Sequence, residues 1–305
     1  MEKKNNPKTK IIAVLGPTSS GKSDVAVLMA KKVNGEIISA DSRQVYKGMN
    51  IGTGKITKKE MCSVPHYLLD VMSPKKIFTV SDFKKLAEKA INTITKKGKI
   101  PIICGGTGLY INSLLDDWSI PNVPPNRKLR KELENKTTDE LFRILSKLDP
   151  RRANNIDAKN PVRLIRAIEI AKTIGGTPEL KKNERFETLR IGLYPKKNIL
   201  EERIKIRLLK RIRAGMASEV KKIKESGVTW KRLNDFGLEY RHVSKYLRGI
   251  FSKEEMLKRL ESEIIKYSKR QMTWFRKDKK VVWFDPMRDK NKIIKISKNF
   301  LKDSL

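Results

Sequence analysis

The feature that most constrains the fold of this chain is a short apolar segment followed by a glycine loop and a helical pattern. Residues 11–15 (IIAVL) have the length and composition of a buried strand, and residues 16–23 (GPTSSGKS) match the spacing G-x-x-x-x-G-K-[ST]. This is the setting of a phosphate-binding loop and of the ATP-binding motif. We therefore predict an α/β fold with a parallel sheet of the P-loop NTPase type. Apolar residues at helical spacing follow at Val25, Ala26, Leu28, Met29 and Val33.

The residue types in this loop favour binding of a polyphosphate. Glycines let the backbone turn its N–H groups toward an anion, and the N-terminus of the next helix adds partial positive charge. Lys22 would reach the terminal phosphates, and Ser23 would hold a Mg²⁺ ion, alone or with Asp41. An ordinary tight turn is the weaker interpretation, because Lys and Ser follow the second glycine in the required order. The candidate phosphate-binding residues are Gly16, Pro17, Thr18, Ser19, Ser20, Gly21, Lys22 and Ser23.

A second predicted strand, residues 36–41 (EIISAD), ends in an acidic residue. Ligands of such sheets sit beyond the carboxyl ends of the strands, so we expect Asp41 beside the phosphate loop. The alternative is that Asp41 only forms a turn or caps a helix, which is common for Asp. The strand that starts at Ile100 runs into Cys104, where an NTP-driven enzyme would usually place a metal-binding Asp. This disfavours an NTP-driven machine and leaves Asp41 as the best acid near the phosphates.

Composition points to a polyanionic partner. Lys and Arg number 69 against 34 Asp and Glu, a net charge of +35. Such an excess favours nucleic acid first and an anionic membrane surface second, although a lysine-rich proteome would account for part of it. The isolated Cys62 and Cys104 suit a reducing cytoplasm and argue against structural zinc. No stretch approaches the ~20 apolar residues of a membrane span, so we expect a cytoplasmic protein.

Changes in composition and hydrophobic pattern along the chain suggest four segments. Residues 1–10 are a basic tail, and residues 11–116 carry the first part of the α/β core. Residues 117–187 begin with chain-breaking prolines and continue with basic helical patterns, so we predict a helical insertion there. Residues 188–305 complete the core and add basic helices. Smaller expectations are strands at 66–71, 189–194 and 281–284, a glycine-broken junction at 236–241, and a helix capped by Ser81 and closed by Gly98.

Basic side chains gather in two helical segments. In residues 267–276 (YSKRQMTWFR), cations, amides and aromatic rings are interleaved, a mixture that serves phosphate contact and base stacking together. The alternative is a solvated helix face with Trp274 and Phe275 in the core. In the helix that starts at Asn160, Arg163 and Arg166 are three residues apart and share one face. The first of these segments is a candidate for contact with a nucleic acid.

Taken together, these segments resemble bacterial tRNA dimethylallyltransferases, also called tRNA isopentenyltransferases. The resemblance covers roughly residues 11–284. The phosphate loop alone is widely shared, whereas DSRQVY at 41–46, GGTGLY at 105–110 and KRQMTW at 269–274 are selective in that order. Further matching segments are PHYLLDV at 65–71, NPVRLIRAIEI at 160–170, IGL at 191–193 and GLEYR at 237–241.

The resemblance implies a prenyl transfer. Dimethylallyl diphosphate would donate its dimethylallyl group to N6 of the adenine on the 3′ side of the anticodon, and diphosphate would leave. The loop, Lys22 and Mg²⁺ would stabilise the charge that develops on the diphosphate. Asp41 would take the proton from the adenine amine as general base, and Thr18 would assist in the loop. Arg207 is a further candidate contact to the diphosphate.

The resemblance also implies contacts with a tRNA anticodon stem-loop, which the insertion and the basic C-terminal face would grip. The target base must leave its stack to reach an enclosed site, and RNA is read mainly through splayed loop bases and backbone shape. Two positions depart from the family pattern: Val162 replaces a polar residue of many relatives, and Asn126 replaces the usual Asp before Arg130. The implied tRNA contacts are Asp41, Ser42, Arg43, Gln44, Thr107, Arg130, Arg163, Arg166, Lys269, Arg270, Gln271, Thr273, Trp274 and Arg276.

Three other functions fit parts of the sequence. An adenylate isopentenyltransferase would share the loop and the acid but needs no tRNA grip, so the net charge of +35 and the insertion disfavour it. A nucleotide or shikimate-type kinase would release ADP from ATP, whereas a prenyl transferase would turn over no ATP. A non-catalytic RNA-binding protein would not depend on Asp41. We favour the prenyl transferase and expect it to be a monomer.

Overall fold

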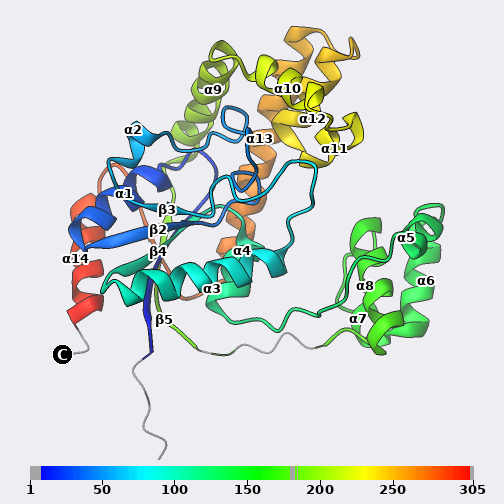
Figure 1. Cartoon of the computed structure of the whole chain (residues 1–305), viewed down its shortest axis with the longest axis horizontal. Helices are drawn as coiled ribbons and strands as arrows, with labels where there is room; N and C mark the ends of the chain where they lie inside the picture. The colour runs from blue at the N-terminus through cyan, green and yellow to red at the C-terminus, as the bar shows by residue number, and fades with distance from the viewer. Residues whose placement is uncertain (1–7, 179–182, 184, 303–305) are drawn as a thin grey trace, which may run out of the picture. The chain divides into compact units, whose positions relative to one another are not determined.

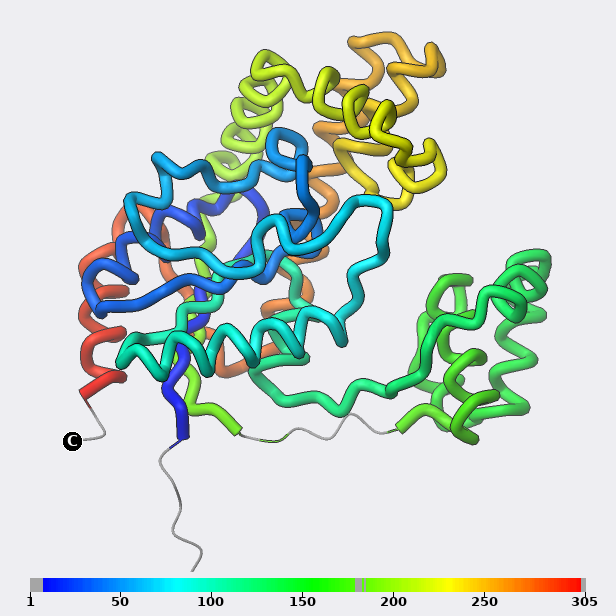
Figure 2. The backbone as a smooth tube through the Cα atoms, viewed as in Figure 1, coloured from blue at the N-terminus to red at the C-terminus, as the bar shows by residue number. Residues whose placement is uncertain are grey.

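The computed structural model describes residues 8–178, 183 and 185–302 of the chain. It divides into two compact units: residues 1–116 with 184–305 form the core unit, and residues 117–183 form the insertion unit (Figure 1). Figure 2 shows that the chain enters the insertion unit once, so the core unit is built from two separate stretches of sequence. The predicted basic tail at 1–10 lies outside the described residues up to residue 7.

The core unit is built on a parallel sheet. Every neighbouring pair among its six described strands is parallel, in the order β3-β2-β4-β1-β5-β6. This confirms the predicted α/β fold with a P-loop-type sheet. The strands are β1 (Lys10–Leu15), β2 (Gly35–Ser39), β3 (His66–Tyr67), β4 (Ile100–Gly105), β5 (Glu187–Leu193) and β6 (Val281–Phe284).

Strand β1 lies at the centre because both of its faces are apolar. Ile11 and Ala13 pack into one apolar cluster, and Ile12 and Val14, which point to the opposite face, pack into another. A strand that is buried on both faces is typical of a parallel sheet covered by helices on each side. The carboxyl ends of β1, β2 and β4 therefore meet at one edge of the sheet, where ligands of such folds bind.

Helices cover both faces of the sheet. The helix α3 (Val80–Lys96) buries Phe83 and Ile91 in the first cluster, and α1 (Lys22–Lys32) and α14 (Lys290–Lys302) bury Val25 and Ile293 in the second. The other helices of the core unit are α2 (Lys58–Met61), α4 (Gly108–Leu115), α9 (Lys197–Arg213), α10 (Met216–Glu225), α11 (Trp230–Phe236), α12 (Leu238–Leu247) and α13 (Lys253–Phe275).

The insertion unit is a set of helices with an apolar core of its own. It contains α5 (Arg127–Glu134), α6 (Thr138–Leu148), α7 (Pro150–Ala153) and α8 (Pro161–Ile174). Leu133, Leu141 and Leu164 belong to its separate cluster and are fully buried. The helix α8 begins where the sequence indicates, because the Asn160 side chain accepts a hydrogen bond from the Arg163 N–H at 3.1 Å.

One predicted helix start is wrong. The helix α3 is capped by Thr79 and not by Ser81, which lies inside its first turn. The Thr79 hydroxyl accepts from the N–H of Asp82, and the Asp82 carboxylate accepts from the N–H of Thr79 at 2.8 Å. This reciprocal capping box satisfies two N–H groups, whereas a lone Ser cap satisfies one.

Two predicted strands are shorter than expected. The strand predicted at 66–71 pairs only through His66–Tyr67, because Leu68 and Asp70 have positive φ angles of 63° and 55° and turn the chain away. The strand β2 ends before Asp41, which lies in the turn that follows. The strands predicted near 189–194 and 281–284 are confirmed, as is the break at Gly237 between α11 and α12.

Among the described residues, no helix is long and apolar enough to cross a membrane.

Candidate active site

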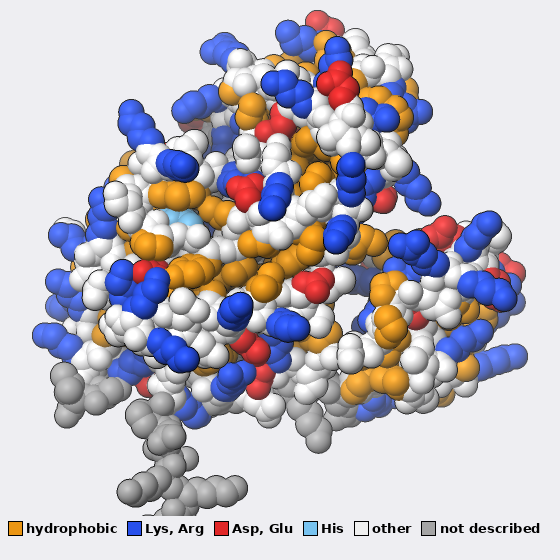
Figure 3. Space-filling model, viewed as in Figure 1, with side chains coloured by type: hydrophobic (Ala, Val, Ile, Leu, Met, Phe, Trp, Pro, Cys, Tyr) orange, Lys and Arg blue, Asp and Glu red, His pale blue; other side chains and the backbone are white. Residues whose placement is uncertain are grey.

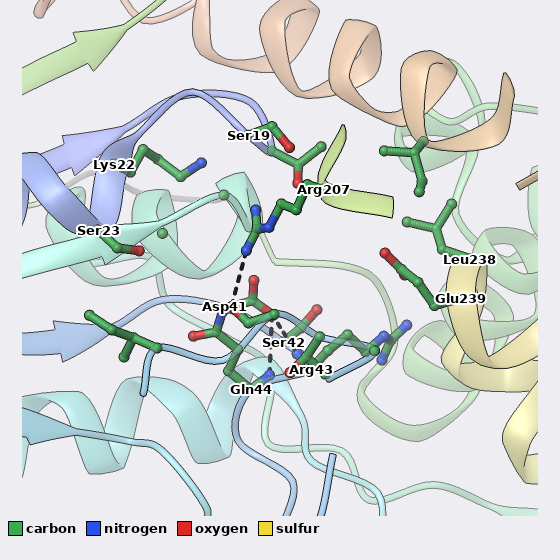
Figure 4. Close-up of a pocket in the computed structure, with 18 of the residues that line it drawn as sticks. Ser19, Lys22, Ser23, Asp41, Ser42, Arg43, Gln44, Arg207, Leu238 and Glu239 are labelled. Atoms are coloured by element: carbon green, nitrogen blue, oxygen red, sulfur yellow. Dashed lines mark hydrogen bonds between the residues drawn. The ribbon is translucent and has the colours of Figure 1, made fainter. Parts of the chain in front are cut away.

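A cavity of about 630 Å³ opens at the carboxyl ends of β1, β2 and β4. Its lining comes from the phosphate loop, the turn after β2, the loop near residues 52–54, and the helices α9, α12 and α13. Figure 4 shows Lys22, Asp41, Arg207 and Glu239 around this cavity on four separate segments. All of these segments belong to the core unit.

The phosphate loop has the backbone that its glycines predict. Gly16 has a φ of +145°, and a Cβ there would lie 2.4 Å from the carbonyl oxygen of Leu193. Gly21 has a φ of +87° and directly precedes α1. Gly16, Pro17 and Ser20 build this turn without lining the cavity. The predicted phosphate-binding residues that do line the cavity are Thr18, Ser19, Gly21, Lys22 and Ser23.

Lys22 is a half-buried cation held by the main chain of its own loop. Its Nζ donates to the carbonyl oxygen of Pro17. Loss of hydration lowers the pKa of Lys22 to about 8, because burial penalises the charged form. A polyanion in the cavity would oppose this effect and favour the charged amine.

Asp41 combines both of the roles that its sequence position allows. Its Oδ1 accepts from the N–H of Arg43 at 2.8 Å and from the N–H of Gln44 at 3.3 Å, so it forms the turn after β2. Asp41 also lines the cavity. Within the described ranges, its second oxygen, Oδ2, has no hydrogen-bond partner from the protein. The carboxylate is therefore fixed through one oxygen and keeps the other for a ligand.

The neighbours of Asp41 hold this turn in place. Ser42 donates its N–H to the Thr107 hydroxyl at 3.0 Å, and Thr107 in turn donates its N–H to the Ala40 carbonyl at 3.2 Å. Arg43 lies over the ring of Phe236, 5.8 Å from its centre. Thr107 therefore supports the turn from behind, while Ser42, Arg43 and Gln44 line the cavity.

Arg207 enters the cavity from α9. Its Nη2 donates to the carbonyl oxygen of Gly54 at 3.1 Å. Burial lowers the pKa of Arg207 to about 10, and the neighbouring Arg211 lowers it as well. In the described part of the chain, Arg207 has no ion pair within 4.0 Å. Its guanidinium keeps most of its N–H donors for a ligand.

The helix α13 brings part of its basic and aromatic segment to the cavity. Arg270 and Gln271 line it. Gln271 is buried, accepts from the Thr18 N–H at 2.8 Å and donates to the Gly106 carbonyl at 2.8 Å. It therefore ties the phosphate loop to the glycine loop after β4. The alternative core interpretation holds for Phe275, which is 2% exposed.

The other predicted residues of α13 lie outside this cavity. Trp274 is partly exposed, packs against Gly108 and donates to the Asn112 side chain at 3.0 Å. Lys269 and Thr273 are exposed on the helix surface. Arg276 lies over the ring of Tyr194 and borders a second cavity of about 330 Å³, lined by Tyr194, Met272, Arg276, Trp283, Phe284 and Asp285.

The predicted arginines of the insertion unit form two different environments. Arg130 and Arg166 both pair with the fully buried Glu169, at 2.7 and 2.5 Å. Burial raises the pKa of Glu169, but hydrogen bonds from both arginines outweigh this effect and lower it to about 2. Arg163 is exposed and has only a 3.8 Å ion pair with the exposed Asp157. Arg163 is thus free to contact a partner, whereas the other two also stabilise the unit.

Sequence reasoning missed several residues of the cavity. Arg203 and Arg211 lie four residues on either side of the predicted Arg207 on α9 and line the cavity with it, so this spacing could have indicated a basic helix face. Glu239 forms an ion pair with Arg211 at 2.9 Å. In the sequence, Glu239 was marked only by its place in the GLEYR segment. Tyr240 also lines the cavity and belongs to the same GLEYR segment, but nothing in the sequence assigned it a role.

This arrangement can bind a polyphosphate and accept a proton in one place. N–H groups and cations surround one part of the cavity, and a carboxylate with a free oxygen lies in the same cavity. Such a site stabilises a leaving group that gains negative charge and removes a proton from an attacking nucleophile.

Comparisons with known proteins agree with this chemistry. A sequence model described as IPP transferase matches residues 44–278. The chain is 39% identical over 284 residues to tRNA dimethylallyltransferase 1 of Syntrophus aciditrophicus, covering 90% of this chain and 93% of that relative. It is 43% identical over 275 residues to tRNA dimethylallyltransferase 2 of Treponema denticola, covering 88% and 92%.

A solved structure has a similar fold. The crystal structure of the full-length tRNA isopentenylpyrophosphate transferase from Bacillus halodurans matches with a TM-score of 0.74 and 35% sequence identity. The match covers 97% of this chain and 98% of that chain. The similarity therefore includes nearly the whole of both proteins.

Proposed function

The chain belongs to the IPP transferase family and transfers a dimethylallyl group to tRNA, and we propose how its cavity carries out this reaction. The donor is dimethylallyl diphosphate, whose diphosphate occupies the phosphate loop between Lys22 and Arg207. The acceptor is N6 of the adenine on the 3′ side of the anticodon, which reaches the same cavity beside Asp41. The products are N6-(dimethylallyl)adenosine in the tRNA and free diphosphate.

One observation supports this proposal most strongly: two half-buried cations enter one cavity, and neither forms an ion pair with the carboxylates that line it. In the described ranges, neither Lys22 nor Arg207 has an ion pair within 4.0 Å. Burial lowers the pKa of each, to about 8 and about 10. A polyanion in the cavity would favour the charged form of both side chains, since nearby opposite charge offsets lost hydration.

The proposed reaction exchanges one bond for another at the allylic carbon. The carbon–oxygen bond of the donor breaks and its electron pair leaves with the diphosphate, while adenine N6 forms a bond to the same carbon. Loop N–H groups, Lys22 and Arg207 stabilise the charge on the leaving group. Thr18 lines the same cavity and donates its hydroxyl hydrogen to the leaving oxygen. Asp41 accepts the N6 proton through its unpaired oxygen.

The oxygen atoms of the site suit Mg²⁺. Ser23 and Asp41 both line the cavity and provide hard oxygen ligands. The described residues contain no group of three His, Cys, Asp or Glu side chains that would hold a metal alone. Mg²⁺ usually binds one or two protein oxygens and takes its other ligands from phosphate and water. We propose that Ser23 would hold Mg²⁺, which when bound would neutralise charge on the diphosphate, while the unpaired oxygen of Asp41 stays available as the base.

Cations on both units support the binding of an anticodon stem-loop. Arg43 and Arg270 line the cavity, and Arg163 is exposed in the insertion unit. The net charge of +35 favours binding to the phosphate backbone. The target adenine must leave its stack before Asp41 can reach its amine. We expect one copy of the chain to bind one stem-loop.

The test is a transfer assay with purified protein, Mg²⁺ and isotope-labelled dimethylallyl diphosphate. An unmodified anticodon stem-loop, AMP and ATP are supplied in separate reactions, and nucleosides are identified by mass spectrometry. We expect label on the adenine 3′ of the anticodon and no ADP. Label on AMP alone would indicate an adenylate isopentenyltransferase, and ADP release would indicate a kinase. Label at another nucleotide would overturn the proposed acceptor.

A further inference from the structure

Glu219 does not line the cavity, yet it holds a loop that contacts two of the cavity's arginines. This side chain of α10 accepts N–H groups from three consecutive residues: Asn50 at 2.8 Å, Ile51 at 2.6 Å and Gly52 at 3.0 Å. Its Oε1 also accepts the hydroxyl of Tyr240 at 2.7 Å. An ionised carboxylate has only acceptors, so it can satisfy all four donors at once.

The opposite side of this loop, residues 50–54, faces α9. The carbonyl oxygens of Gly52 and Gly54 accept from Arg211 at 3.2 Å and from Arg207 at 3.1 Å. The loop therefore places its N–H groups on Glu219 and its carbonyl groups on the arginines. A shift of the loop away from Glu219 would move the acceptor that orients Arg207.

Close packing leaves this loop little room to move. A Cβ on Gly52 would lie 2.8 Å from the Tyr240 ring, which is 1% exposed. A Cβ on Gly54 would lie 2.3 Å from Nη2 of Arg207. Glycine at both positions allows Tyr240 on one side and Arg207 on the other to contact the backbone directly.

We propose that Glu219 is a positioning residue for the donor's diphosphate. By fixing the loop at 50–54, Glu219 sets the carbonyl of Gly54, and this carbonyl directs the guanidinium of Arg207 into the cavity. In the described part of the chain, the bond to Gly54 is the one hydrogen bond of Arg207, so the loop is its main constraint. This inference rests on the proposed use of the cavity for a diphosphate.

The first test replaces Glu219 by Gln, which keeps the size of the side chain but sets an amide donor against the loop's donors. We expect Glu219→Gln to weaken binding of inorganic pyrophosphate, measured calorimetrically with Mg²⁺, by about 10-fold, which is about 1.4 kcal/mol. The kcat/KM for dimethylallyl diphosphate should fall at least as much, because Arg207 also stabilises the charge on the leaving diphosphate, while stem-loop affinity changes by less than about 2-fold. Glu225→Gln is the matched control, because Glu225 is exposed on the same helix.

A double variant separates positioning from general destabilisation. If Glu219 acts through Arg207, the pair Glu219→Gln with Arg207→Ala should bind pyrophosphate no more weakly than Arg207→Ala alone. Additive losses, or a Glu219→Gln protein that binds like wild type, would overturn the inference. Tyr240→Phe removes one hydrogen bond from Glu219 and should produce a smaller loss in the same direction. If Glu219→Gln does not fold, Tyr240→Phe serves as the test variant instead.

The wild-type protein separates this inference from the proposed function. A wild-type protein that binds no pyrophosphate contradicts the diphosphate site itself, and with it the role of Glu219. Normal wild-type binding together with unchanged binding by Glu219→Gln, or by Tyr240→Phe where Glu219→Gln does not fold, contradicts the positioning role alone.

Discussion

The N–H of Thr18 donates a 2.8 Å hydrogen bond to the side-chain oxygen of Gln271, which lies 253 residues later in the chain. The amide nitrogen of the same Gln271 donates to the Gly106 carbonyl, also at 2.8 Å. A single buried side chain therefore joins the loops that follow β1 and β4. This contact gives the selective KRQMTW segment a role inside the protein, beside any contact with RNA.

Loss of this contact should loosen the phosphate loop. Gln271→Ala removes two buried hydrogen bonds, each worth about 0.5–1.5 kcal/mol. We expect kcat/KM for dimethylallyl diphosphate to fall about 10-fold in steady-state assays, while stem-loop binding measured by fluorescence anisotropy weakens less. Ser262→Ala, at an exposed position of the same helix, is the control. A larger loss of stem-loop affinity than of donor kcat/KM would instead assign Gln271 mainly to RNA contact.

The role of Asp41 as base can be tested without disturbing its turn. Asn keeps an oxygen that accepts from the N–H groups of Arg43 and Gln44, and Asn is a good turn former. Asp41→Asn should therefore keep stem-loop binding, while single-turnover transfer falls by about 100-fold or more, the usual contribution of a general base. Transfer at the wild-type rate would exclude Asp41 as the base.

The pKa of Lys22 predicts a pH dependence of donor capture. Because burial lowers this pKa to about 8, the free protein loses the charge on Lys22 as pH rises through that value. We expect kcat/KM for dimethylallyl diphosphate to fall above about pH 8, since kcat/KM reports groups of the free enzyme. Lys22→Arg, which keeps its charge, should show no such fall even if its overall activity is lower. A wild-type profile that stays flat to about pH 10 would contradict this assignment.

The same pKa shift has a defined sign for stability. The folded protein gives up the Lys22 proton at about pH 8, and the unfolded chain keeps it to about 10.5. The unfolded state therefore binds more protons between these values, and the contribution of Lys22 to folding stability rises with pH across this window. Comparing wild type with Lys22→Met by urea unfolding at about pH 7 and pH 9.5 checks this: the variant's advantage should shrink at the higher pH.

The arginines of the insertion unit should separate into two classes. Glu169→Gln leaves Arg130 and Arg166 without their shared carboxylate, so we expect the unit to lose about 1–3 kcal/mol of stability. Arg163→Ala removes an exposed side chain, so it should leave thermal unfolding unchanged and weaken stem-loop binding. The slope of log affinity against log salt should also fall by about one for Arg163→Ala. Equal thermal unfolding of the Glu169→Gln and Arg163→Ala proteins would contradict this division.

The ion pairs of Glu169 should also make the stability of the protein depend on acidic pH. The folded pKa of Glu169 is about 2 against an ordinary value of 4.5. Its contribution to stability is therefore complete above about pH 4.5 and is lost as pH falls from there toward 2. Chemical unfolding between about pH 6 and pH 3 should show a steeper loss for wild type than for Glu169→Gln.

The parts of the site that the sequence could predict are the local ones. The phosphate loop is specified by residues next to one another, so its spacing predicted both its backbone and the positions of Lys22 and Ser23. Asp41 followed from the end of an apolar strand, and β2 does end just before it. The wrong cap at Ser81 shows the limit of such rules, because Thr79 and Ser81 are both good capping residues and only the partner Asp82 decides between them.

The parts that the sequence could not predict depend on tertiary contacts. Glu219 binds backbone groups 167 to 169 residues earlier in the chain, and no spacing rule connects a carboxylate to such distant N–H groups. Arg207 was predicted as a diphosphate contact only from the family resemblance, although its spacing from Arg203 and Arg211 predicts a shared helix face. The sequence left open whether Trp274 is buried or exposed. Its ring packs on Gly108 and its indole N–H donates to Asn112, yet part of the side chain stays exposed.

The parallel pairing of β1 with β5 has a consequence for how the protein is made. When the ribosome has completed β4, β1 can pair on one side only, because its other neighbour, β5 (Glu187–Leu193), has not yet been synthesised. At typical translation speeds this delay lasts on the order of ten seconds. During that time the apolar centre of the sheet presents an open edge, the kind of surface on which nascent chains aggregate. The insertion, which emerges in this interval and has its own apolar core, thus sets how long the growing chain needs protection.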